Sequence, residues 1–280
     1  MTNQIRRDKR AIIFGLALAI TYFMGSLSVS HSAAWLQPQG QLEVHYEHVS
    51  SDYNQNFQGV ENHYTRETEQ IYFEYGYRDT LTLVGKYLSG QSGAGLGSEQ
   101  DRTEIFEVAV RQKGGLKKGK LLPTGLAPLW KIMSPDPPLR QFHSSLDFGL
   151  GYSPSMEKAY TLIQYAVSDK IATTHQYPIS VYTEIALNYQ YYENGFQASK
   201  AITRVELAYR HFHVAYERLD GRFWGAYPYN EHLWFGEFGI PLNPQLKLIG
   251  KWGHERTLPG IPRETFIIFG VQVKRGASKH

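Results

Sequence analysis

The feature that most constrains this chain is an alternation of apolar and polar residues with a period of two, which runs through almost everything after residue 40. Residues 179–191 show it most clearly, with Val181, Ile185 and Leu187 on one face and Glu184 on the other. A strand places successive side chains on opposite faces, whereas a helix repeats every 3.6 residues. The chain is therefore predicted to be all-β.

The alternation marks about twelve strands: 41–49, 70–77, 81–87, 103–112, 145–152, 159–168, 179–191, 201–210, 212–218, 231–242, 246–253 and 265–273. The connections between them differ in length. Those at 77–80, 209–212 and 243–244 are tight, whereas 50–66, 89–102, 220–230 and 255–263 are longer and polar. An even number of strands with short turns at one end and long loops at the other is typical of a membrane-spanning barrel.

Which face of these strands meets water is decided by where charges and aromatic residues stand. The hairpin at 71–87 carries the lone charges Glu74 and Lys86 on the face opposite most of its aromatic side chains, which are Phe73, Tyr75, Tyr77 and Tyr87. Aromatic residues make up 14% of the chain, and Tyr75 and Tyr77 stand at a strand end, where interfacial girdles lie. No apolar helix is available to cover a sheet. The pattern predicts a transmembrane antiparallel up-and-down β-barrel; a secreted or periplasmic β-sandwich is the alternative.

The first 34 residues have the composition of a secretory signal. Basic residues at 6–10 precede an apolar stretch at 11–24, and small residues follow at 28–34. We expect cleavage just before Ala33 or Trp35; an uncleaved anchor helix is the alternative. The predicted organisation is a signal peptide at 1–34, an outer-membrane barrel at 35–274 with an irregular insertion at 113–141, and a polar tail at 275–280.

Charge and cysteine content exclude several classes of function. The chain has 29 Lys and Arg against 26 Asp and Glu, but four of the basic residues and one acid lie in the signal segment, which leaves 25 of each. The basic balance is therefore no indication of nucleic-acid binding. Without cysteine there is no disulfide, thiolate metal site or cysteine nucleophile. No cofactor is expected, and the expected partners are membrane lipids and a small polar solute.

Three motifs resemble a family of proteobacterial outer-membrane porin-like proteins. They are the start A-W-L-Q-P-Q-G at 34–40, the hairpin E-Y-G-Y-R-D-T-L-T-L at 74–83 and the strand pair G-I-P-L-N-P-Q-L-K-L at 239–248. Some members of that family accompany exopolysaccharide production. The resemblance implies a bacterial outer-membrane location, passage of a polymer or small saccharide solute, and association with envelope export machinery. The ending K-R-G-A-S-K-H departs from the terminal aromatic residue that is usual in such barrels.

If the apolar face meets lipid, the charged face lines the lumen, by which we mean the interior of the barrel. The predicted pore-lining residues are Glu43, His45, Glu47, Glu74, Lys86, Glu107, Arg111, Glu184, Arg204, Glu206, Arg210, Glu237, Lys247 and Lys251. Such a mixed set acts as a selectivity lining in a pore or neutralises itself in a filled barrel. Tyr72, Tyr182 and Phe235 are the expected interior aromatics, with Trp234 added if the alternation slips by one residue. The predicted function is an outer-membrane channel or export conduit, and a plugged structural barrel is the alternative.

A second alternative is an outer-membrane ester hydrolase that uses a Ser–His pair. The local candidates are His143-Ser144-Ser145 and Thr174-His175, and neither has an identifiable third orienting group. His211 and His213 are a weak metal candidate. The Pro- and Gly-rich insertion at 113–141 is consistent with a degenerate strand pair, a short amphipathic helix or an excursion into the lumen.

Overall fold

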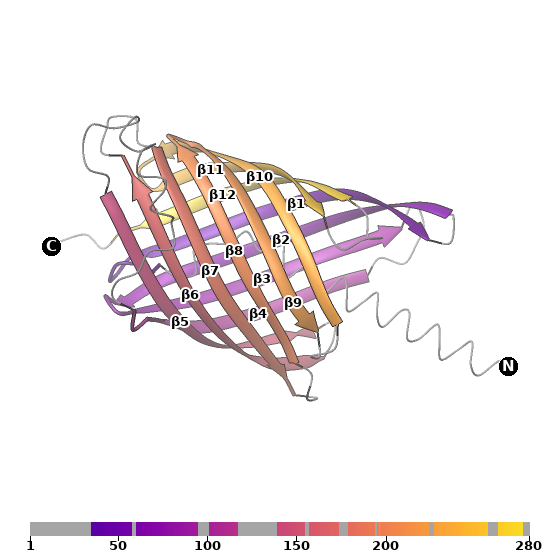
Figure 1. The fold of residues 1–280 in the computed structure, drawn as a ribbon, viewed down its shortest axis with the longest axis horizontal. Coiled ribbons are helices and arrows are strands. Elements are labelled where there is room, and N and C mark those ends of the chain that lie inside the picture. Colours follow the sequence, from indigo (N-terminus) through magenta and orange to yellow (C-terminus); the bar gives the residue numbers. More distant parts are fainter. Residues whose placement is uncertain are drawn as a thin grey trace.

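The computed structural model describes residues 35–57, 60–94, 101–116, 139–154, 157–173, 179–193, 195, 197–223, 227–256 and 263–276. The expected signal peptide lies outside them. The described residues form twelve strands: β1 (Leu42–Phe57), β2 (Val60–Arg78), β3 (Leu81–Ala94), β4 (Asp101–Lys113), β5 (Leu139–Ser153), β6 (Lys158–Ala172), β7 (Ile179–Tyr192), β8 (Gln197–Tyr209), β9 (Phe212–Phe223), β10 (Tyr227–Asn243), β11 (Leu246–Arg256) and β12 (Arg263–Arg275). Each strand pairs with its neighbours in sequence, and β1 pairs with β12 in an antiparallel register to close the barrel. Figure 1 shows the strands tilted around a common axis. The predicted up-and-down barrel is confirmed.

Most strands are longer than the alternation of side chains predicted. β1 and β2 pair as far as Phe57 and Val60, so most of the predicted loop 50–66 is a hairpin ribbon. Its sequence is polar, with three Asn, two Ser and two Gln. A ladder of backbone hydrogen bonds does not require an apolar face, so the strand continues where the apolar pattern stops. The predicted loops at 89–102, 220–230 and 255–263 are shortened in the same way.

Three two-residue turns define one end of the barrel, the turn end, at Asp79–Thr80, Arg210–His211 and Pro244–Gln245. At the last of these, the Asn243 side-chain oxygen accepts hydrogen bonds from the backbone N–H groups of Gln245 (2.8 Å) and Leu246 (2.9 Å). This is the way in which Asn favours a turn. The opposite end, where β1 meets β2 and β11 meets β12, is the loop end.

Exposure is the reverse of that in a water-soluble protein. Outward side chains such as Val108 (60% exposed) and Phe269 (63%) are uncovered, whereas the inward Glu184 is 2% exposed. A belt of exposed apolar residues around a closed barrel is the surface that lipid covers. The β-sandwich is therefore wrong, and the chain forms a transmembrane barrel of the bacterial outer-membrane type. Among the described residues no helix is long and apolar enough to cross a membrane, a finding that has no bearing on crossing by strands.

The aromatic residues predicted for the interface lie on this outer surface. Tyr75, Tyr77 and Tyr209 point outward beside the turns. Trp252 also lies on this surface and packs against Phe212 at the turn end, with ring centroids 5.7 Å apart. The two residues lie on β9 and β11, which are separated by β10. The tilt of the strands brings their side chains to the same height along the barrel axis.

The described strands β4 and β5, which flank the predicted insertion, are hydrogen-bonded to each other, so no described strand lies between them in the barrel. Residues 139–141, the end of the predicted insertion, already belong to β5. Residues 114–116 lie against β5: the Gly114 N–H donates to the carbonyl of Ser144 (2.7 Å), and the Ser144 hydroxyl donates to the carbonyl of Leu116 (3.1 Å). The helix and lumen alternatives concern residues outside those described.

Candidate functional site

All but one of the predicted pore-lining side chains point into the lumen and are buried or half-buried there: Glu43, His45, Glu47, Glu74, Lys86, Glu107, Arg111, Glu184, Arg204, Glu206, Glu237, Lys247 and Lys251. Arg210 is the exception. It is exposed in the β8–β9 turn with φ 53°, and its guanidinium lies 5.3 Å from the ring centroid of Tyr209. The alternation does not hold in a tight turn, because positive φ breaks the extended backbone.

Arg111 is the centre of a buried charge network on the β2–β5 wall. Its Nε donates to both carboxylate oxygens of Asp147 (3.0 and 3.1 Å), and its Nη1 donates to Glu74. The Tyr72 hydroxyl also donates to Glu74. One guanidinium therefore serves two carboxylates in a place where an unpaired charge is costly.

The segment before β1 folds into the turn end of the lumen, which the sequence did not predict. The carbonyl of Trp35 accepts from Arg111 Nη1 (3.1 Å), and the Gln37 backbone N–H donates to Thr82 Oγ1 (2.9 Å). The Gln37 amide also donates to Glu74 (2.7 Å). Gly76 makes room for the segment, since a Cβ there would lie 2.0 Å from the carbonyl oxygen of Pro38.

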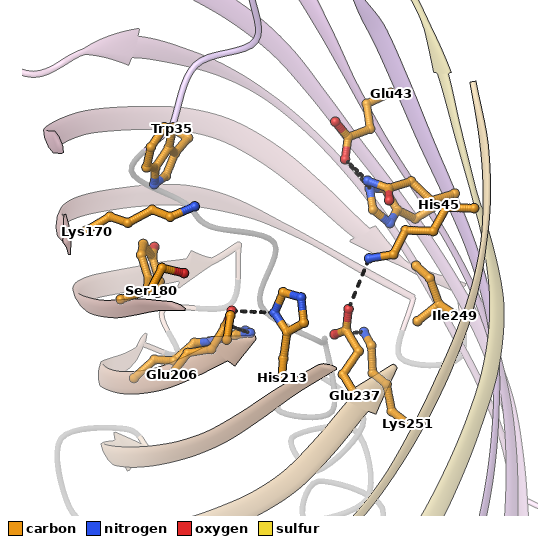
Figure 2. A pocket seen from close by; sticks show the side chains of 15 residues that line it. Trp35, Glu43, His45, Lys170, Ser180, Glu206, His213, Glu237, Ile249 and Lys251 are labelled. Atoms are coloured by element: carbon orange, nitrogen blue, oxygen red, sulfur yellow. Dashed lines mark hydrogen bonds and ion pairs between the residues drawn. The ribbon is translucent and has the colours of Figure 1, made fainter. Parts of the chain in front are cut away.

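A cavity of about 310 Å³ lies inside the barrel at the turn end. Figure 2 shows its walls, with Trp35 and Lys170 on one side and Glu237 and Lys251 across from them. Its lining comes from β1, from the strands β6 to β12 and from the segment before β1: Trp35, Glu43, His45, Lys170, Ser180, Tyr182, Arg204, Glu206, Ala208, His213, Glu237, Lys247, Ile249, Lys251 and Gln272. It is therefore a site that closure of the sheet creates.

The carboxylates of the cavity are held by basic groups, as Figure 2 shows for several of them. Glu206 contacts Arg204 (2.6 Å) and the ring of His213 (2.7 Å). Glu237 lies 3.5 Å from Lys251 and 3.7 Å from Lys247.

Two further acids complete this wall. Glu43 lies 2.6 Å from the His45 ring and 3.0 Å from Lys274. Lys251 also contacts Glu47 at 2.8 Å, and both side chains are almost fully buried. These fixed pairs form a rigid polar wall rather than a set of mobile charges.

Apolar clusters lie inside the barrel beyond these charges. Val49, Phe235 and Phe266 pack with Ala215 and Ile268 on the β9–β1 wall. Tyr160 packs with Leu88 and Ile105 on the opposite wall, and its hydroxyl donates to Glu107 (2.5 Å). Phe235 and Tyr182 are inward, as predicted, and Trp234 is outward with 58% exposure, so the alternation does not slip in β10.

His143 and Ser144 do not form a Ser–His pair, and Ser145 is fully buried on the same face as His143. The His143 ring lies in the lumen against Trp35, with centroids 3.9 Å apart, whereas the Ser144 hydroxyl donates to Leu116 on the other face of β5. Thr174 and His175 lie outside the described residues. His211 is exposed in a turn, and the described residues contain no group of three or more metal-ligating side chains.

The sequence did not predict several residues of the cavity, and three of them show different reasons. Trp35 precedes the first strand, where no alternation exists to orient it. Lys170 follows the predicted end of its strand at 168, but β6 runs to Ala172 and keeps Lys170 on the inward face with Ala166. Continuing the alternation of this strand by two residues, from 168 to 170, predicts Lys170 on the inward face. The sequence marks His213 only as a weak metal candidate with His211, whereas the structure places it in the cavity wall.

Comparisons with known proteins find similar solved structures but no family for this chain. No family model and no curated protein matches the sequence. The solved translocator domain of the autotransporter NalP from Neisseria meningitidis is similar at 10% identity and a TM-score of 0.45, over 95% of this chain and 97% of that one.

Two further structures are an outer membrane channel from Pseudomonas putida F1 (8% identity, TM-score 0.49, 88% of this chain and 99% of that one) and the KdgM porin with disordered oligogalacturonate (13%, 0.44, 85% and 99%). At these values the similarity assigns neither a family nor a solute to this chain. The resemblance to the porin-like family stays a prediction.

Proposed function

We propose that this protein is an outer-membrane channel through which a small polar or saccharide solute passes by diffusion. The observation that carries the proposal is the cavity inside the barrel, whose wall consists largely of ion-paired acids and bases. Fixed charges of both signs offer a polar solute hydrogen bonds in place of its hydration water. Because the charges are paired, no single strong electrostatic field holds the solute in the pore. Passage outward, in association with envelope export machinery, stays a prediction from the family resemblance.

Single-channel recording in a planar lipid bilayer tests this proposal. The wild-type protein is expected to give discrete conductance steps in potassium chloride. Lys247→Glu is the informative variant, because Lys247 is half-buried at the cavity and lies 3.7 Å from Glu237. Replacing a lumen cation by an acid is expected to shift the reversal potential in a salt gradient toward cation preference. Arg218→Glu is the control, since Arg218 is exposed on the outer surface.

A plugged structural barrel is the second candidate, and one observation favours it. The segment from Trp35 to Gln41 lies in the turn end, where the Gln37 amide donates to both Glu43 (3.2 Å) and Glu74 (2.7 Å). Through these two hydrogen bonds, the side chain of Gln37 links β1 to β2 inside the lumen. A closed trace for the wild-type protein, inserted at a verified density, would overturn the channel and leave the plugged barrel.

A further inference from the structure

One cationic side chain of the cavity has no carboxylate partner among the described residues. The carboxylates of the cavity are Glu43, Glu206 and Glu237, and basic groups hold each of them. The cationic side chains are Arg204, Lys247, Lys251 and Lys170. The first three are used by carboxylates.

Lys170 has no ion-pair or hydrogen-bond partner among the described residues. It leaves β6 beside Tyr182, its register partner on β7, and Figure 2 shows its ammonium group directed into the cavity near Trp35. Lys170 is half-buried rather than solvated at a rim. A half-buried ammonium group without a carboxylate is a site that an anion from solution can complete.

The wall next to Lys170 is aromatic. The Trp35 ring is held in place by the His143 ring at 3.9 Å and by the Ala166 and Ala186 cluster. Its backbone carbonyl is fixed by Arg111. A rigid indole beside a cation presents an apolar plane and a charge to the same ligand, which suits a ring that carries an acidic group.

We infer that Lys170 and Trp35 form a binding site for a monoanionic sugar, in which Lys170 pairs with the carboxylate of a uronic acid and the indole contacts the pyranose ring. This inference rests on the proposed channel, because it names the class of solute that the channel takes. The cavity volume of about 310 Å³ accommodates a single sugar residue. The paired acids across the cavity accept hydrogen bonds from its hydroxyl groups.

Calorimetric titration of the detergent-solubilised full chain with three probes tests the site. Sodium glucuronate carries both the ring and the carboxylate, glucose carries the ring alone, and acetate carries the carboxylate alone. Glucuronate is expected to bind at least about tenfold more tightly than either partial probe, because a charge-assisted hydrogen bond adds that much. Equal binding of the three probes, or no binding of glucuronate, would overturn the inference.

Matched variants separate the two contributions. Lys170→Met is expected to weaken glucuronate binding about tenfold and to leave glucose unchanged. Lys86→Met is the control, since Lys86 is also a half-buried lumen lysine but does not line the cavity. Trp35→Leu is expected to weaken glucuronate without changing acetate, and Trp35→Tyr to restore part of the loss. Glucuronate binding by Lys170→Met at wild-type strength contradicts the site.

Bilayer recordings make failure of this site distinguishable from failure of the channel. A protein that conducts chloride but shows no glucuronate-dependent block keeps its channel function and loses the site. A protein that binds glucuronate in the titration but never conducts keeps the site and loses the channel. If Lys170→Met does not fold, Lys170→Gln takes its place, and the three-probe comparison on the wild-type chain decides the question without it.

Discussion

At the residue scale, the interior of this barrel depends on charges that have partners. Arg111 is 2% exposed and holds Glu74 and Asp147 at once, so each side chain makes the burial of the others tolerable. The sequence predicted that Arg111 and Glu74 face inward, because both follow the period of two. It did not predict that they meet, because β2 and β4 are separated by β3 and their approach depends on the curvature of the sheet.

Replacing Arg111 tests the importance of this pairing. Arg111→Met leaves two buried carboxylates without their cation, and the loss of folding free energy is expected to be about 3–5 kcal/mol. The measurement is the urea midpoint of the barrel in detergent. Arg218→Met is the control, because its ion pair with Asp220 is exposed on the outside and is expected to change the midpoint little. Equal midpoints for the two variants would mean that water reaches the network.

At the scale of the element, the segment before β1 is attached by close backbone contact as well as by side chains. The Gly40 N–H donates to the Gly76 carbonyl at 2.7 Å, and the Gly76 N–H donates to the Gln41 carbonyl at 2.9 Å. Gly76 also lies beside a register shift between β2 and β3. No local sequence pattern predicts this role of Gly76. The role depends on the segment before β1, which is not itself a strand and lies over β2 at Gly76.

Gly76→Ala is therefore expected to displace the segment that carries Trp35. Its Cβ would lie 2.0 Å from the Pro38 carbonyl oxygen, and overpacking of this kind costs about 1–3 kcal/mol. We expect larger conductance steps than in the wild-type protein and faster proteolysis at the N-terminal end. Gly115→Ala is the control, since a Cβ there meets nothing within 4 Å. Unchanged conductance in Gly76→Ala would show that the segment does not narrow the path.

At the scale of the whole molecule, stability depends on the surroundings of the outer face. The belt of apolar side chains has no protein partner and is compatible with the folded state only in lipid or detergent. The sequence determined this belt almost completely, because the alternation in each of the twelve strands places apolar residues on the same outward face.

A charge within this belt is the corresponding test. Val108→Arg places a guanidinium on the outward face near the middle of β4, where the cost is about 2–4 kcal/mol. Gln112→Arg is the control on the same strand and face, but at the turn end, where the cost falls to about 0–1 kcal/mol. The measurement is the temperature at which the folded band on an unheated gel is lost. Similar temperatures for both variants would contradict the lipid-facing assignment.

What the sequence determined by itself is the architecture: the number of strands, the three tight turns and the face of each strand that meets lipid. These depend on local periodicity, which the order of residues contains. Only the tertiary structure decided which interior charges pair, that Lys170 has no carboxylate partner within the described part of the chain, and that Trp35 occupies the lumen. The physical reason is that these contacts join strands that are distant around the barrel, and closure of the sheet determines those distances.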